Sequence, residues 1–207
     1  EQFKDLQLSY LKASVLDIDV PTDQLIFAVL FKIAKKHNIK YVISGNNVVT
    51  EYILPKKWFF AAKFDLRNLK AIHKEFGTKK LKNFPALTKW HRLINKKVNK
   101  IEYFNILNYI PYNKQQVLEF ITKELGWVNY GGKHFESIFT RFYQGYILPK
   151  KFGIDKRKAH LSNLVCSGQI TKQQALNELS DDHYSKALQD EDKAYFIKKF
   201  DLTDAQF

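Results

Sequence analysis

A short apolar run that ends at a polar turn constrains the fold of this sequence more than any other feature. The run IKYVI, residues 39–43, is uninterrupted and rich in β-branched residues, which is typical of a buried strand in a parallel sheet. It stops at the turn Ser44-Gly45-Asn46-Asn47. Small hydrogen-bonding residues directly after such a strand predict an α/β unit with a polar site at the carboxyl end of the strand.

The segment before this strand predicts a helix that is buried on more than one face. Pro21 and Thr22 open it, with Thr22 as the N-cap, and Asn38 ends it. The stretch between them, LIFAVLFKIA, is apolar almost all round. Helix, buried strand, polar turn and a second helix together predict the α/β fold class.

After residue 54 the sequence predicts a mainly helical region with one strand near its middle. We therefore divide the chain into residues 1–54, the remainder of an α/β domain, and residues 55–207, a mainly helical C-terminal region. The expected elements are helices from Asp65 to Gly77, over 83–98, from Asn113 to Leu125 before Gly126, from the capping box Thr171–Gln174 and over 190–200, and a strand over 100–110 closed by Pro111.

Composition excludes several classes of protein. A hydrophobic content of 45% in 207 residues predicts a packed core rather than disorder. One cysteine, Cys166, excludes an internal disulfide framework and a cysteine-cluster zinc site. No run approaches the roughly 20 apolar residues of a membrane span. The opening residues lack the plan of a signal peptide, so we expect a cytoplasmic protein.

The net charge of +13 favours polyanionic partners. These could be nucleic acid, nucleotide phosphates or an anionic membrane face. The alternative is a basic surface without a specific ligand. Lysine pairs are scattered along the chain instead of forming an arm, and no RRM, KH or helix-turn-helix pattern is present. We therefore do not expect nucleic acid as the principal ligand.

The turn after the strand is the first candidate site. Gly45 permits close approach of a ligand or a positive φ, and Asn46 and Asn47 can read an adenine, a ribose or an amide. Glu51 lies four residues after Asn47, on the same face of the expected helix, where a carboxylate could hold Mg²⁺ against phosphate oxygens. The alternative is a structural Asx turn followed by a solvated glutamate.

Two further clusters combine cations with acid–base groups. With the turn as the first cluster, the second cluster, residues 130–141, is a Gly-Gly turn followed by Lys, His, Glu and Arg, which supplies cations for phosphate and an acid–base pair. The third cluster, residues 150–160, holds lysines, an arginine and His160, which would suit a leaving pyrophosphate. The alternatives are a turn leading into a charged helix and a solvated basic surface.

Several long stretches resemble the N-acetyl sugar amidotransferase family of lipopolysaccharide O-antigen and nonulosonic-acid biosynthesis. The stretches are PTDQLIFAVLFKIAKKHNIKYVISGNN, ILPKKW, LRNLKAIHKEFG, ELGWVNYGGKHFESIFTRFYQGYILPKKFGIDKRKAHLS and SGQITKQQAL, which span nearly the whole chain. That family belongs to the PP-loop ATP pyrophosphatases. The resemblance implies the C-terminal part of a parallel-sheet, adenine-nucleotide α-hydrolase-like domain followed by a helical extension.

The resemblance also implies a reaction. ATP would adenylate the amide oxygen of an acetamido group on a nucleotide-activated sugar, and ammonia from glutaminase- and cyclase-like subunits would displace AMP, leaving an acetamidino group. ATP and Mg²⁺ would be required, and a homo-oligomer is compatible with the resemblance. The implied roles are catalytic for Lys133, His134, Glu136 and Arg141, cofactor-binding for Ser44, Gly45, Asn46, Asn47, Lys150, Lys156 and Arg157, and Mg²⁺-binding for Glu51.

One departure from the family limits this interpretation. The PP-loop, a Ser-Gly-Gly-x-Asp-Ser run after the first strand, does not occur in the sequence, nor do the N-terminal cysteines of the family. We therefore expect these 207 residues to be catalytically incomplete. Two alternatives stay open: a non-catalytic basic module that binds RNA or an acidic partner protein, and a nucleotide-activated RNA modification like that of tRNA-thiolating relatives.

Overall fold

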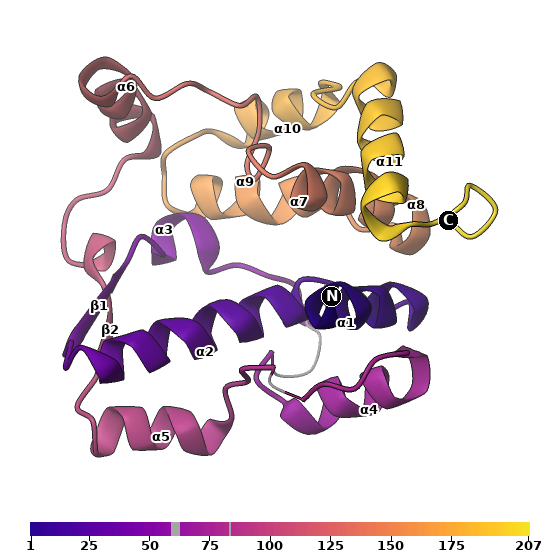
Figure 1. Cartoon of the computed structure of the whole chain (residues 1–207). Coiled ribbons are helices and arrows are strands. Elements are labelled where there is room, and N and C mark those ends of the chain that lie inside the picture. Colours follow the sequence, from indigo (N-terminus) through magenta and orange to yellow (C-terminus); the bar gives the residue numbers. More distant parts are fainter. Residues whose placement is uncertain (59–62, 83) are drawn as a thin grey trace. The chain divides into compact units, whose positions relative to one another are not determined.

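The structure is a computed structural model that describes residues 1–58, 63–82 and 84–207 (Figure 1). It is mainly helical, and its two strands, β1 and β2, pair in a parallel sheet. In chain order the elements are α1 (Gln2–Lys12), α2 (Val20–Lys36), β1 (Tyr41–Ser44), α3 (Val48–Glu51), η1 (Lys56–Trp58), α4 (Leu66–Phe76), α5 (Lys89–Lys97), β2 (Glu102–Asn105), η2 (Ile106–Asn108), α6 (Lys114–Leu125), α7 (Ile138–Phe142), η3 (Tyr143–Ile147), α8 (Leu148–Phe152), α9 (Lys156–Cys166), α10 (Lys172–Ser180) and α11 (Lys186–Phe200).

The chain forms two compact units, and each consists of two segments. Unit 1 is Glu1–Ser44 with Lys57–Phe104, and unit 2 is Gly45–Lys56 with Asn105–Phe207. The chain passes from unit 1 to unit 2 directly after β1, within the turn selected from the sequence. The division into an α/β remainder and a helical region at residue 54 stays a prediction, as does the PP-loop fold class.

The helix before the strand forms as predicted, but its N-terminus and its burial differ from the prediction. Its N-cap is Asp19, three residues before the predicted N-cap Thr22, because Pro21 is accommodated in the first turn. Ile26 is 53% exposed and Ile33 is 49% exposed, so one apolar face of α2 is open. The prediction of burial on more than one face is therefore wrong for this structure.

The predicted strand is present as β1, and its burial also differs from the prediction. Tyr41 and Ile43 are 66% and 67% exposed, whereas the next residue, Ser44, is buried. Among the described residues β1 pairs only with β2, so its apolar side chains are not enclosed as they would be in a central strand. β2 is also shorter than the predicted strand, because a 3₁₀ turn, η2, begins at Ile106.

Local capping signals located several helices well. α4 begins after Asp65, whose side chain accepts from the backbone N–H groups of the next turn, and ends at Gly77. α6 begins after Asn113 and ends at Gly126, which has a φ of 64°. The capping box at Thr171 starts α10 as predicted.

The first residues of two other helices were predicted less accurately. The helix expected over 83–98 is α5, which begins only after Thr88, because a capping box between Thr88 and His91 fixes its start there; Asn83 lies outside the described residues. The last helix, α11, begins after Ser185 instead of at residue 190. The serine side chain caps this earlier start by accepting from Leu188 N–H.

Each unit has its own core. In unit 1, α1, which was not predicted, packs against α2 and α4 through Leu6, Tyr10, Val20 and Leu69. In unit 2, aromatic rings of α7 and α11 pack together around Phe142. No helix of the described parts of the chain is both long and apolar enough to cross a membrane.

Candidate functional site

The turn after β1 connects the strand to a one-turn helix, α3, as the sequence predicts. Asn47 is buried, and its side-chain Oδ1 accepts from the backbone N–H of Thr50 at 2.9 Å and from the Thr50 hydroxyl at 3.2 Å. This oxygen therefore serves as the N-cap of α3. Gly45 is exposed, its φ is not positive, and an added β-carbon would meet nothing within 4 Å. The turn therefore does not require a glycine at this position.

Glu51, at the end of α3, lies next to a residue of the second cluster. Its Oε1 accepts from Lys133 Nζ at 3.0 Å, across 82 positions of sequence. Asn163 of α9 holds the chain just beyond Glu51, because its side chain accepts from Ile53 N–H at 2.7 Å and donates to Ile53 O at 3.2 Å. Unit 2 thus brings the first and second sequence clusters together.

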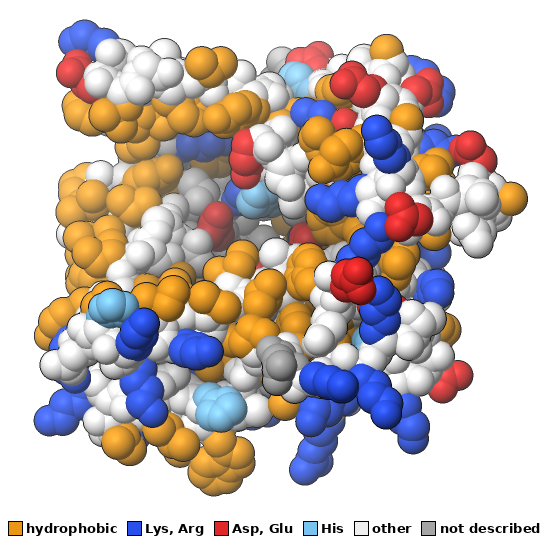
Figure 2. Space-filling model, in the orientation of Figure 1, with side chains coloured by type: hydrophobic (Ala, Val, Ile, Leu, Met, Phe, Trp, Pro, Cys, Tyr) orange, Lys and Arg blue, Asp and Glu red, His pale blue; other side chains and the backbone are white. Residues whose placement is uncertain are grey.

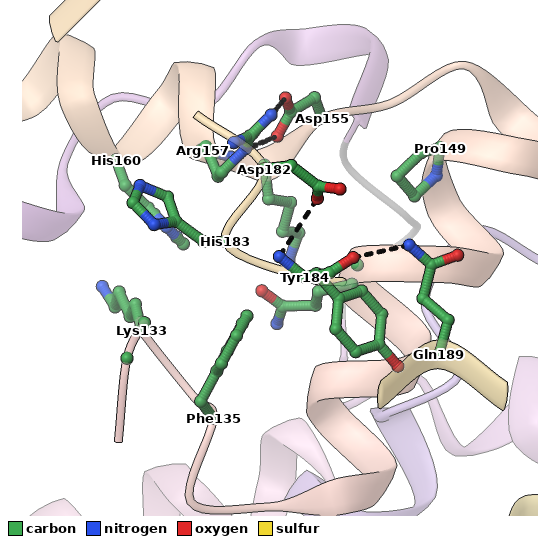
Figure 3. A pocket seen from close by; sticks show the side chains of 15 residues that line it. Lys133, Phe135, Pro149, Asp155, Arg157, His160, Asp182, His183, Tyr184 and Gln189 are labelled. Carbon is green, nitrogen blue, oxygen red and sulfur yellow. Dashed lines mark hydrogen bonds and ion pairs between the residues drawn. The ribbon is translucent and has the colours of Figure 1, made fainter. Parts of the chain in front are cut away.

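A cavity of about 220 Å³ in unit 2 is lined by residues of the second and third clusters and of the segment before α11 (Figure 3). Lys133 and His160 lie on one side of it, and Tyr184 and Gln189 lie on the other. The ring of Phe135 packs edge-on against Tyr184, with centroids 5.8 Å apart. The other lining residues are Gly131, Gly132, Gln144, Gly145, Pro149, Asp155, Lys156, Arg157, Asp182 and His183.

His160 lines the cationic side of this cavity, and the ring of His134 lies next to it outside the lining. The rings of His134 and His160 have centroids 6.2 Å apart. Burial, together with the neighbouring Lys133, His134 and Lys156, lowers the pKa of His160 to about 3. Burial and Lys133 also lower the pKa of His134. Both imidazoles are therefore neutral at pH 7, so His160 can accept a hydrogen bond from a ligand in the cavity.

The backbone around His134 is strained. His134 has a φ of 67°, in the left-handed region that non-glycine residues seldom adopt, and Gly131 has a φ of 87°. The Nδ1 atom of His134 lies 3.8 Å from Glu136 Oε1, and both side chains are partly exposed. The side chains of His134 and Glu136, the predicted acid–base pair, are thus close to each other. Of the four predicted catalytic residues, however, only Lys133 lines the cavity.

Arg141, predicted to be catalytic, forms a buried ion pair outside the cavity lining. Its Nε and Nη2 each donate to an oxygen of Asp192 at 2.7 Å, and its Nη1 donates to Phe135 O at 3.2 Å. Tyr184 also donates its hydroxyl to Asp192, at 2.7 Å. The guanidinium therefore anchors two aromatic residues of the cavity wall, and this geometry favours a positioning role over direct contact with a substrate.

The three predicted cofactor-binding cations of the third cluster differ in position. Lys156 and Arg157 line the cavity, whereas Lys150 is exposed on α8 and does not. Arg157 donates to both carboxylate oxygens of Asp155 and, through Nη1, to Asp181 O at 3.0 Å. This guanidinium therefore joins the start of α9 to the loop after α10.

The described residues include no group of three or more histidine, cysteine or acidic side chains that could hold a metal ion. Glu51 is a single carboxylate, and it is already paired with Lys133. A resident metal ion therefore does not fit this site. Mg²⁺ is commonly bound by one or two carboxylates together with substrate phosphates, and such a role for Glu51 stays a prediction.

Comparison with protein families connects this site to one class of proteins. Residues 136–207 match the family model described as LPS biosynthesis protein WbpG-like, C-terminal domain. This part of the chain is similar to lipopolysaccharide biosynthesis proteins. The match includes His160, Tyr184 and Gln189 of the cavity as well as Arg141 and its partner Asp192. None of the curated proteins and none of the solved structures compared with the chain gives a significant match.

The match confirms the predicted connection of the C-terminal part to lipopolysaccharide biosynthesis. The amidotransferase reaction and the PP-loop superfamily stay predictions. Several cavity residues were not selected from the sequence, among them Phe135, Tyr184 and Gln189. His160 was selected, as the histidine of the cluster over residues 150–160. Tyr184 and Gln189 carry no local signal, because only the packing of segments far apart in the sequence brings them to the cavity.

Two glycines let aromatic rings lie directly against the backbone. A β-carbon on Gly145 would lie 2.6 Å from the ring of Tyr184, and one on Gly132 would lie 2.9 Å from the ring of Phe135. Gly145 belongs to η3, a π-helical turn, and such turns are frequent at functional sites. The wall of the cavity therefore depends on the absence of side chains at these positions.

We expect Gly145→Ala to displace the Tyr184 ring and to lower the free energy of unfolding by about 1–3 kcal/mol, as overpacking does. Thermal unfolding and near-ultraviolet circular dichroism would measure both effects. Gly45→Ala is the matched control, because its β-carbon would meet nothing, and it should stay within about 0.5 kcal/mol of the parent. An unchanged near-ultraviolet spectrum for Gly145→Ala would contradict the predicted displacement of Tyr184.

Proposed function

We propose that this chain binds a nucleotide-activated acetamido sugar and belongs to an N-acetyl sugar amidotransferase of lipopolysaccharide biosynthesis. The unit 2 cavity carries the proposal, because it is cationic at one side and aromatic and amide-rich at the other. Lys133 and Lys156 would bind the diphosphate. Phe135 and Tyr184 line the cavity and would supply aromatic contacts to a sugar.

The polar groups opposite the lysines support recognition of an amide. Gln144 and Gln189 line the cavity, although Gln189 Nε2 already donates to Tyr184 O at 2.7 Å. The side-chain oxygen of Gln189 can still accept a hydrogen bond from an acetamido N–H. The diphosphate and the acetamido group would thus each meet a suitable group of the same cavity.

In the proposed reaction, the amide oxygen attacks the α-phosphorus of ATP and pyrophosphate leaves. Ammonia then adds to the amide carbon, and AMP departs with the former amide oxygen, so that an acetamidino group remains. The attacking ammonia loses its protons to water, and the neutral imidazole of His160, which lines the cavity, accepts a hydrogen bond from it. A PP-loop outside these 207 residues would hold the ATP phosphates, and glutaminase- and cyclase-like subunits would supply the ammonia.

Binding of UDP-N-acetylglucosamine, measured by isothermal titration calorimetry, tests the proposal without requiring catalysis. We expect saturable binding by the parent chain. Lys133→Ala should raise the Kd about 10- to 100-fold, because a charge-assisted hydrogen bond contributes about 1.5–3 kcal/mol. Lys133 is only partly buried, so its replacement should leave the fold intact.

Lys150→Ala is the matched control, since Lys150 is a nearby lysine that lies outside the cavity lining. It should bind the nucleotide sugar as the parent does. An absence of saturable binding by the parent, or equal losses from both substitutions, would contradict the proposed site. For the whole enzyme, release of ADP and phosphate instead of AMP and pyrophosphate would contradict the proposed reaction.

A further inference from the structure

The positive charge of the chain is concentrated in one unit. Unit 1 contains nineteen lysines and arginines against eight acidic residues, whereas unit 2 contains fifteen against thirteen. Unit 1 therefore carries +11 of the net charge of +13. Lysines occur throughout the sequence, but only in unit 2 are they balanced by acidic residues. The cavity of unit 2 thus does not explain the basic character of the protein.

Within unit 1 the excess charge comes mainly from residues 65–100, which form α4, α5 and the segment between them. This stretch has eleven basic residues and only two acidic ones, Asp65 and Glu75. In Figure 2, blue side chains gather over α4, α5 and their connection, and few red ones lie among them. All eleven basic residues are exposed: Arg67, Lys70, Lys74, Lys79, Lys80, Lys82, Lys89, Arg92, Lys96, Lys97 and Lys100. We call this set the basic surface.

α5 adds apolar side chains to the basic surface. It has no buried residue, yet it is strongly amphipathic. Trp90 is 73% exposed, and Leu93 and Ile94 are 47% and 44% exposed. Val98, at the C-cap, is 71% exposed. These four side chains recur at helical spacing and form an apolar face that no described part of unit 1 covers.

The polar side of α5 is basic, and two local interactions hold this helix in place. Lys89, Arg92 and Lys96 are spaced three and four residues apart, on the side of the helix away from Trp90 and Ile94. The guanidinium of Arg92 lies over the ring of Phe64, 4.9 Å from its centroid, which attaches α5 to the unit. With the capping box at Thr88, the helix keeps its place without burying its apolar face.

We propose that the basic surface and the apolar face of α5 bind the protein to an anionic membrane surface. A basic helix with tryptophan and aliphatic residues on its other face is suited to lie in the interface plane of a bilayer. Lysines and arginines attract the headgroup phosphates, and Trp90 and Ile94 enter the boundary of the acyl chains. This binding is peripheral and goes beyond the proposed reaction.

The apolar face favours a lipid surface over RNA. RNA-binding surfaces combine cations with aromatic rings on which bases stack. Leu93, Ile94 and Val98 offer no such ring, and the exposed rings of α5 are those of Trp90 and His91. Aliphatic side chains contribute to binding only where an apolar phase receives them, as the acyl boundary of a bilayer does.

Vesicle cosedimentation with the full chain tests this proposal. We expect binding to phosphatidylcholine vesicles that contain phosphatidylglycerol, weaker binding to phosphatidylcholine alone, and a decrease as salt increases. Lys96→Glu with Lys97→Glu should lower the partition coefficient at least about tenfold, since each basic residue near such a surface contributes on the order of a fivefold effect. Trp90→Ser with Ile94→Ser should lower it on both kinds of vesicle.

Exposed residues of unit 2 provide matched controls. Lys198→Glu with Lys199→Glu changes an exposed lysine pair at the end of α11, and Leu125→Ser removes an apolar side chain that is 75% exposed on α6. Neither should alter vesicle binding. Loss of binding in these controls equal to that in the α5 variants would overturn the proposal, because the effect would then follow total charge or hydrophobicity.

A nucleic-acid ligand would give another pattern. A fluorescent single-stranded RNA should bind weakly, and Trp90→Ser with Ile94→Ser should reduce vesicle binding more than RNA binding. If the parent bound RNA at physiological salt and failed to bind anionic vesicles, the membrane proposal would be overturned.

Discussion

Replacement of Asp192 by alanine is expected to lower the free energy of unfolding by about 3–5 kcal/mol, because it leaves the Arg141 guanidinium buried without its anion. Asp192 is only 1% exposed, and it receives three hydrogen bonds, two from Arg141 and one from Tyr184, all at 2.7 Å. An arginine side chain stays protonated in proteins even without an anionic partner, so the Arg141 guanidinium stays charged in the variant. Urea denaturation followed by far-ultraviolet circular dichroism would measure the loss.

Asp190→Ala is the matched control on the same helix. Asp190 is exposed and pairs with Lys186 one turn earlier, so its removal should change the free energy of unfolding by no more than about 0.5 kcal/mol. Asp192→Asn keeps one acceptor oxygen, which can receive at most two of the three donors, and should fall between the two alanine variants. Similar losses for Asp192→Ala and Asp190→Ala would show that the Arg141–Asp192 pair does not stabilise the fold.

The Asp192 network gives Arg141 a partner that the sequence did not indicate, which is why a catalytic role was assigned to Arg141 instead. Arg141 follows a Gly-Gly turn and a Lys-His-x-Glu run within a few residues, so its local pattern is that of a phosphate-binding group. Its partner lies 51 residues later on α11, and nothing near Arg141 in sequence indicates that contact. Long-range pairing of buried charges depends on helix packing, which local patterns do not encode.

Predictions based on local chemistry were more accurate than those based on burial. Asp65, Asn113 and Gly126 mark helix ends because capping is decided within one turn of the chain. The IKYVI run predicts a strand correctly, but apolar composition alone cannot predict which of its faces is covered. The apolar residues of β1 and α2 form the predicted strand and helix, but several of them are exposed where burial was predicted.

The candidate site shows the same limit. The sequence selects Glu51 and Lys133 separately, and the structure joins them in one ion pair across 82 positions. Asn47 was assigned to nucleotide recognition, whereas its oxygen caps α3, which was the structural alternative. A buried asparagine before a helix fits both interpretations at the level of sequence. The observed hydrogen bond shows the capping role, and nucleotide recognition by Asn47 stays a prediction.

The surroundings of His160 predict a dependence of stability on pH. Burial and the positive charge of Lys133, His134, Lys156 and Lys114 lower its pKa to about 3, below the ordinary value of about 6.5. Between these two pKa values the unfolded chain binds a proton that the folded protein does not. Stability therefore falls as the pH decreases from about 6.5, with a slope of up to about 1.4 kcal/mol per pH unit.

His160→Gln removes this titration, so the variant should lose less stability on acidification than the parent. Urea denaturation at pH 7 and pH 4.5 should give a difference between the two of about 2–3 kcal/mol in that loss. Other acid-sensitive groups, such as Asp5, are present in both proteins and cancel in the comparison. Ser162→Ala, an exposed substitution on the same helix, should shift the curve equally at both pH values. Parallel curves for His160→Gln and the parent would mean that His160 gains its proton in the folded protein near its ordinary pKa, and would contradict the lowered pKa of His160.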